Sequence, residues 1–308
     1  MFAVYSTLAP LLLATDMQAN LLPRGDDNGI PIVELTAIQY KDRGFLAYER
    51  GDYEDAIVDY DLAIGKNPNY TEAYYERGLA KAAQKRYQEA VVDYDEAIHL
   101  KPEDNEEFYQ ARGNANFNLK RYAPAIEDYS EVIRIFPNDI NSYYYRGLAK
   151  AAQKQYKGAI DDYDEAIHRS SGSRDIYRAR GWAKYELKQY KAAIDDYNKA
   201  IRIYDDRKSY YKRGLANVGL KEYELAISDF DRAISLSHPL DMDPDDAYVY
   251  YQRALAKKEL SRFEEAIADL QTAFPLAMRI ANDDSELAVV INDLLRELRS
   301  HSGESQNE

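Results

Sequence analysis

The sequence predicts an all-α fold built from one short helical unit that is repeated along the chain. Arg-Gly dipeptides that follow a tyrosine by three residues recur about every 34 residues, and their glycines are Gly44, Gly78, Gly113, Gly147, Gly181 and Gly214. Composition carries the same signal, because 29 tyrosines stand beside eight phenylalanines and one tryptophan. Copying a single template explains both observations, so the chain is divided into repeats rather than into two ordinary domains.

The repeat occurs seven times when the recurring glycine is numbered position 8 of a template. Ala254 takes this place in the last copy, after an acidic insertion that lengthens the spacing. The predicted units are residues 37–70, 71–105, 106–139, 140–173, 174–206, 207–246 and 247–276.

Each unit is predicted to form two antiparallel helices joined by a short Lys-rich turn. Apolar residues recur at helical spacing over template positions 2 to 13 and again from position 17 onward. Small residues at positions 8 and 20 allow close approach of the two helices, and Pro68, Pro102 and Pro137 follow where the second helix should end. Thr36 and Gln39 form a predicted capping box at the start of the first unit.

This pattern resembles the tetratricopeptide repeat, which has an aromatic residue at position 4, Gly at 8, Ala at 20, an aromatic residue at 24 and Pro at 32. Alanine occupies position 20 in all seven units: Ala56, Ala90, Ala125, Ala159, Ala193, Ala226 and Ala266. The resemblance implies a right-handed superhelical solenoid of seven helix-turn-helix units whose first helices line a concave face. The chain departs from the family pattern in having Arg at position 7 and Lys, Asn or Ala at position 11.

Two charged positions are the same in every unit, Arg at 7 and Asp at 23. A ligand that contacts all seven units identically is an implausible reason for such regularity. We therefore predict a repeated structural ion pair between the two helices of each unit, as in Arg43 with Asp59.

Composition excludes several classes of function. The net charge of −14 disfavours binding to nucleic acid or to an anionic membrane surface, because both require a positive field. Cysteine is absent, which removes disulfides and thiolate chemistry. The longest uncharged apolar run, residues 2–15, is too short for a membrane-spanning helix.

No catalytic centre is predicted, because the sequence has no Gly-rich phosphate loop, nucleophile elbow or cluster of metal ligands. Asp241, Asp243 and Asp245 resemble the start of a calcium loop, but Asp246 and Gln252 stand where such a loop has Gly and Glu. The insertion is therefore predicted to be a solvated acidic connector. We expect no enzyme activity, no cofactor and no metal.

In the family that the pattern resembles, ligands bind the first helices at positions 2, 5, 6, 9, 12 and 13. These positions are acidic in the first three units, with Asp42, Glu49, Glu72, Glu76 and Glu107, and become basic and aromatic later. The candidate partner-binding residues are Tyr144, Tyr145, Arg178, Trp182, Lys208, Tyr211 and Lys212. They favour a protein or peptide partner with an acidic segment; the alternative is that the aromatic residues only pack neighbouring helices together.

Some family members hold a peptide's terminal carboxylate with a clamp of Lys, Asn and Arg at defined positions. Lys208 and Lys212 match only the last part of that clamp, and Tyr144, Leu148 and Ala179 stand where the rest should be. An Hsp90-type co-chaperone is therefore not expected. The alternatives to a peptide-binding scaffold are a structural homo-oligomer and an exported assembly factor.

The ends of the chain are predicted to be different from the repeats. Residues 277–299 contain an amphipathic helix that would cap the solenoid, and residues 300–308 are predicted to be disordered. Residues 1–36 form a leader or linker. A cytoplasmic location is favoured because no Lys or Arg precedes the apolar run; a secreted or periplasmic location would follow if residues 1–19 act as a signal peptide.

Overall fold

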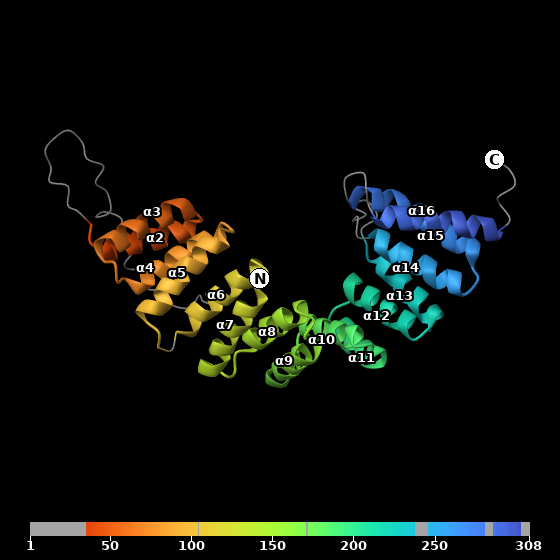
Figure 1. The fold of residues 1–308 in the computed structure, drawn as a ribbon, viewed down its shortest axis with the longest axis horizontal. Helices are drawn as coiled ribbons and strands as arrows, with labels where there is room; N and C mark the ends of the chain where they lie inside the picture. Colours follow the sequence, from red (N-terminus) through yellow and green to blue (C-terminus); the bar gives the residue numbers. More distant parts are fainter. Residues whose placement is uncertain (1–34, 104, 171, 238–245, 281–285, 303–308) are drawn as a thin grey trace. The chain divides into compact units, whose positions relative to one another are not determined.

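The computed structural model describes residues 35–103, 105–170, 172–237, 246–280 and 286–302. Over these ranges the protein consists of fifteen helices and contains no strand (Figure 1). The helices are α2 (Ala37–Arg50), α3 (Tyr53–Lys66), α4 (Thr71–Ala83), α5 (Tyr87–Leu100), α6 (Glu106–Asn118), α7 (Tyr122–Ile135), α8 (Ile140–Ala152), α9 (Tyr156–Arg169), α10 (Arg174–Glu186), α11 (Tyr190–Ile203), α12 (Arg207–Gly219), α13 (Tyr223–Ser235), α14 (Asp246–Glu259), α15 (Phe263–Ile280) and α16 (Glu286–Ser302).

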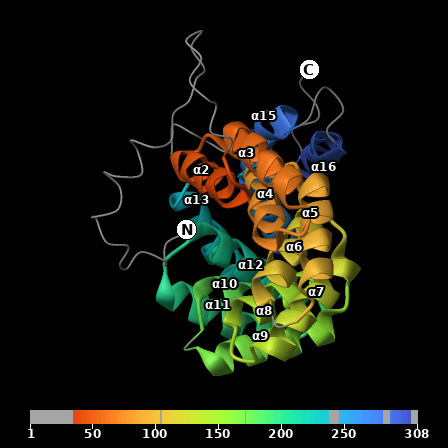
Figure 2. The same ribbon diagram turned by 90° about the vertical axis from the view of Figure 1, so that its left-hand side faces the viewer.

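The chain divides into two compact parts, Met1–Glu131 and Val132–Glu308, called here the N-terminal part and the C-terminal part. In both parts consecutive helices pack in pairs, α2 with α3 and α4 with α5 in the first, and α8 with α9 through α14 with α15 in the second (Figures 1 and 2). Within each part, the second helix of a pair also packs on the first helix of the next pair, and successive first helices contact each other. This confirms the predicted solenoid of helix-turn-helix units.

The local signals at the helix ends are confirmed. The Gln39 amide donates to the Thr36 hydroxyl at 3.3 Å and the Thr36 amide donates to the Gln39 side chain at 2.9 Å, which completes the capping box. Helices α3, α5 and α7 each end two residues before a proline, namely Pro68, Pro102 and Pro137. Proline stops the helix there because it has no amide hydrogen to donate.

The turn inside each unit places template position 15 in the left-handed backbone region. The residues are Gly51 with φ 84° and Lys85, Lys120, Lys154, Lys188, Lys221 and Ser261 with φ between 59° and 63°. Each turn is closed by backbone bonds such as Lys85 N to Ala82 O at 2.9 Å. The Lys-rich turn is therefore a C-cap that reverses the chain, at a conformational cost that only the first unit avoids with glycine.

The recurring glycine is required by the aromatic ring at position 24. A Cβ added to Gly78 would lie 2.5 Å from a ring carbon of Tyr94, and one added to Gly181 would lie 2.8 Å from a ring carbon of Tyr197. The last unit has Ala254 opposite Leu270 instead, and both are fully buried. Alanine is tolerated in that unit because no ring occupies the space.

The C-terminal end is capped as predicted, with two differences in length. Helix α15 continues through Pro275 to Ile280, and α16 packs on α15 through Ile291, Leu294 and Leu298. Helix α16 also runs to Ser302, so residues 300–302 are helical rather than part of the predicted disordered tail. The predicted leader up to residue 34 and the tail from residue 303 lie outside the described residues.

Candidate functional site

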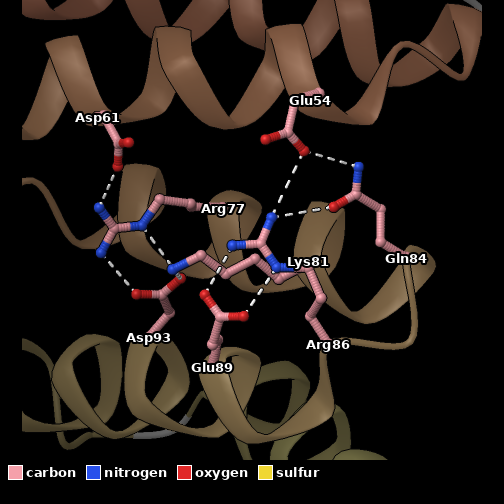
Figure 3. Close-up of polar contacts among 8 residues, drawn as sticks. All are labelled: Glu54, Asp61, Arg77, Lys81, Gln84, Arg86, Glu89 and Asp93. Atoms are coloured by element: carbon pink, nitrogen blue, oxygen red, sulfur yellow. Dashed lines mark hydrogen bonds and ion pairs between the residues drawn. The ribbon is translucent and has the colours of Figure 1, made fainter.

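The invariant charges form a buried cluster that holds adjacent units together (Figure 3). Arg77 donates to both oxygens of Asp93 at 3.1 and 2.6 Å, and to Asp61 of the preceding unit at 2.5 Å. Lys81, one helical turn further on, lies 2.8 Å from Asp93, whose side chain is only 2% exposed. Asp93 is therefore matched by two cations, and Arg77 bridges two units.

The pair of Arg at position 7 with Asp at position 23 recurs in every unit, which confirms the predicted ion pair. The pairs are Arg43–Asp59, Arg77–Asp93, Arg112–Asp128, Arg146–Asp162, Arg180–Asp196, Arg213–Asp229 and Arg253–Asp269. Each guanidinium also lies over the position-4 tyrosine of its own unit, 5.2 to 5.6 Å from the ring centroid. Position 11 supplies a second donor to the aspartate from Lys81, Lys150, Lys184, Lys257, Asn116 and Asn217.

This cluster explains the departures from the family pattern together. Arg at 7 pairs with Asp at 23 in every unit, and Lys or Asn at 11 adds a second donor to that aspartate in every unit except the first, which has Ala47. These charges are occupied in the scaffold and are not free to bind a partner.

All seven candidate partner-binding residues lie on first helices of the C-terminal part, namely α8, α10 and α12. The Tyr144 ring on α8 packs against Tyr163 and Tyr145, with centroids 6.2 and 5.3 Å apart. Burial raises the pKa of the Tyr144 hydroxyl, and the negative charge of Asp175 adds to the shift. Tyr144 is thus largely a packing residue, whereas Tyr145 is 38% exposed.

Arg178 was grouped with Lys208 and Lys212 as a basic candidate for partner binding, but its guanidinium is ion-paired within the chain. It lies 2.6 Å from Asp175 and 3.3 Å from Asp206. Asp206 is the N-cap of α12 and also accepts hydrogen bonds from the Ser209 amide and hydroxyl. Arg178 therefore joins α10 to the beginning of α12, and we assign it a structural role.

Trp182, Tyr185 and Lys212 form an aromatic platform that carries a cation. The rings of Trp182 and Tyr185 are stacked, with centroids 5.0 Å apart and planes inclined by 15°. The Lys212 Nζ lies 3.2 Å from the centroid of the Trp182 ring. Burial lowers the pKa of Lys212 to about 8, against an opposing effect from Glu186.

A residue that the sequence analysis missed lies in the same repeat. The Tyr197 ring is fully buried and its hydroxyl has no hydrogen-bond partner among the described residues. The equivalent hydroxyl of Tyr129 donates to Asn114 at 2.8 Å. Asn114 occupies template position 9, where the repeat of Tyr197 has Trp182, and that difference was the signal available in the sequence.

Lys208 and Tyr211 line a cavity of about 270 Å³ between α12 and α14, together with Arg207, Tyr248 and Val249. Arg207 is neutralised by Asp246 at 2.5 Å. Lys208 is exposed and forms no ion pair with any described residue.

The prediction of a solvated acidic connector is wrong for the last residue of the insertion, Asp246. Its side chain is 2% exposed and it accepts a hydrogen bond from the Ser237 hydroxyl at 2.8 Å in addition to its ion pair with Arg207. The rest of the insertion, residues 241–245, lies outside the described residues.

The first helices of the N-terminal part have the opposite character. Burial raises the pKa of the Glu76 carboxyl on α4, although Lys41 of α2 lies 3.9 Å away. Lys41 is also 2.9 Å from Asp42. Two of the acidic residues predicted at these positions, Asp42 and Glu76, therefore already share a cation.

The arrangement defines an all-α solenoid of paired helices. Among the described residues, no helix combines the length and the apolar character that a membrane span requires. Two tetratricopeptide repeat family models match the chain, one over residues 42–105, 144–208 and 178–247 and the other over residues 106–139 and 247–276. The chain belongs to the tetratricopeptide repeat family.

Solved structures share the fold at low sequence identity. A tetratricopeptide repeat protein from Parabacteroides merdae matches with a TM-score of 0.60 and 20% identity over 85% of this chain and 98% of its own. The C-terminal part of a repeat protein from Cytophaga hutchinsonii matches with a TM-score of 0.66 and 16% identity, over 81% and 98%. YrrB, described as a repeat protein with an unusual peptide-binding site, matches with a TM-score of 0.53 and 21% identity, over 56% and 89%. No curated protein matches the chain in sequence.

Proposed function

We propose that the protein is a non-catalytic scaffold that binds an acidic peptide or protein segment on the first helices of its C-terminal part. The observation that carries the proposal is the pair of lysines on α12: Lys208 is exposed without an ion pair among the described residues, and Lys212 lies on Trp182 instead of on a carboxylate. Family membership supports the class of function, since tetratricopeptide repeats generally act by binding other proteins.

The charges that the scaffold does not use support an acidic ligand. Each position-7 arginine is held by its aspartate, and Arg178 is held by Asp175 and Asp206. Lys208 and Lys212 remain, on the same helix and four residues apart, so both project near one face of α12. A ligand carboxylate would supply the ion-pair partner that neither lysine has among the described residues.

Aromatic residues on the first helices of the C-terminal part provide contact area. Tyr145 and Tyr248 are 38% and 41% exposed, and Trp182 is half-buried. Aromatic side chains at such positions commonly carry most of the binding energy of an interface, because they bury a large area with few rotatable bonds. An extended peptide that crosses α8, α10, α12 and α14 would contact them in turn.

Binding of fluorescein-labelled peptides that alternate Asp with Gly and Ser tests the proposal, measured by fluorescence anisotropy. We expect Lys208→Glu to weaken binding about tenfold without a change in melting temperature, because the side chain is exposed and makes no ion pair that the scaffold needs. Lys191→Glu, on the second helix α11, is the matched control because it makes the same change in net charge at an exposed position. Equal losses for both variants would show only general electrostatic attraction.

A further inference from the structure

The cavity between α12 and α14 has the size and lining of a pocket for one amino-acid side chain. Its volume is about 270 Å³, below the roughly 300–1,000 Å³ of sites that enclose a whole small molecule. The rings of Tyr211 and Tyr248 and the side chain of Val249 line it. An apolar side chain is the occupant that this lining would stabilise.

The depth and the rim of this cavity differ in character. Val249 is 2% exposed and belongs to the core around Ala226, Phe230 and Ala233, whereas Tyr248 is 41% exposed. The cavity therefore leads from the surface, at Tyr248 and Lys208, to the packed interface of α12 with α14.

The two charged side chains that line the cavity, Arg207 and Lys208, differ in whether they have an ion-pair partner among the described residues. The Arg207 guanidinium is paired with the buried carboxylate of Asp246 at 2.5 Å, so its charge is already balanced. Lys208 lines the same cavity without an ion pair in the described chain. The occupant should therefore combine an apolar group with a negative charge close to it.

We infer that this cavity is a specificity pocket that receives a large aliphatic or aromatic side chain of the bound peptide, adjacent to an acidic residue that pairs with Lys208. The inference rests on the proposed function and extends it by naming the residue pair that the peptide must contain. Acidic segments without a neighbouring apolar residue would bind less tightly.

Two labelled peptides of equal length test the pocket, one with a Leu-Asp pair and one with Ala-Asp, each flanked by Gly and Ser. We expect the Leu peptide to bind the wild-type protein about tenfold more tightly in anisotropy titrations, because the larger side chain buries more apolar surface. In Tyr248→Ala, which removes an exposed wall of the cavity, this ratio should fall to about twofold. Tyr204→Ala is the control: Tyr204 is 60% exposed at the end of α11 and should leave the ratio unchanged.

The Lys208→Glu variant separates the pocket from the proposed function, because it should weaken both peptides by the same factor. Equal affinities of the Leu and Ala peptides for the wild-type protein would overturn the pocket while leaving acidic-peptide binding intact. Failure of both peptides to bind would overturn the pocket and the proposed function together. Self-association that Tyr248→Ala abolishes, seen by sedimentation velocity, would assign the cavity to a second copy of the chain and overturn the peptide pocket.

Discussion

Template position 6 carries opposite charges in two regions of the molecule, Glu76 on α4 of the N-terminal part and Lys212 on α12 of the C-terminal part. Burial is the main cause of both pKa shifts: it raises the pKa of the Glu76 carboxyl and lowers that of the Lys212 amine. The same repeat geometry thus disfavours the charged form at this position whichever sign the sequence supplies.

The two regions differ in how that charge is balanced. Glu76 has a cation close by, since Lys41 lies 3.9 Å away, and its carboxyl also interacts with the Tyr60 hydroxyl. Lys212 has an aromatic ring at 3.2 Å instead of a carboxylate. The repeat sets the burial of this position, and the residues of the neighbouring repeat set how its charge is balanced. This difference supports the proposal that a charged ligand binds near Lys212.

The largest expected effect comes from breaking the network that both regions share. Asp93→Ala and Asp196→Ala should each lower the free energy of unfolding by about 3–5 kcal/mol, because each leaves an arginine and a lysine without their buried carboxylate. Urea denaturation of both variants measures the loss, and similar values would show that the two regions use one scaffold.

The matched controls are Asp61→Ala and Asp164→Ala, whose side chains are 55% and 54% exposed although they pair with the same arginines. They should cost about 0–1 kcal/mol. A loss at Asp164 as large as that at Asp196 would contradict the assignment of the buried aspartate as the centre of the network.

An intermediate effect is expected from the contact between glycine and ring. Gly78→Ala and Gly181→Ala should each lower stability by about 1–3 kcal/mol, because the added carbon lies 2.5 or 2.8 Å from a ring carbon that is packed in the core. Thermal and urea unfolding measure the change. Gly65→Ala is the control, since nothing lies within 4 Å of its added carbon and alanine favours a helix.

The last repeat shows how the clash can be relieved, because it pairs Ala254 with Leu270. The double variant Gly78→Ala with Tyr94→Leu should therefore recover part of the stability that Gly78→Ala loses. Strict additivity of the two single changes would show that glycine and ring do not interact.

The smallest effect sharpens the comparison of Glu76 with Lys212 through pH. A lowered lysine pKa means that the folded state binds fewer protons than the unfolded state between about pH 8 and 10.5, so the wild type should gain stability relative to Lys212→Met as pH rises through that window. The gain measured from pH 7 to 9.5 should be of order 1 kcal/mol. Thermal melts of both proteins across that range provide the measurement.

Glu76 should give the opposite slope. Its raised pKa means that the folded state binds more protons, so the wild type should lose stability relative to Glu76→Gln as pH rises above the ordinary value of 4.5. If the stability of the wild type and of its variant changed in parallel with pH, for Lys212→Met or for Glu76→Gln, the burial of position 6 would be contradicted.

The repeats could be predicted from the sequence because their determinants are local and recur. The Arg43–Asp59 pair lies within one helix pair and recurs in all seven units, and the contact of Gly44 with Tyr60 recurs in six of them, so the copies report the same geometry. The helix ends near Pro68, Pro102 and Pro137 follow from the missing amide hydrogen of proline. Agreement between helical spacing, turn and packing signals was enough to determine the fold.

Only the tertiary structure decided how each candidate residue is buried and paired. Arg178, Lys208 and Lys212 are all basic and on neighbouring first helices, yet Arg178 is held by an aspartate 28 residues away, Lys212 lies on Trp182, and Lys208 stays exposed beside a cavity. Asp246 belongs to an acidic run in the sequence but is buried against Arg207. The sequence determines the sign of the charge at each position. Burial and pairing depend on residues that meet only when consecutive repeats pack together.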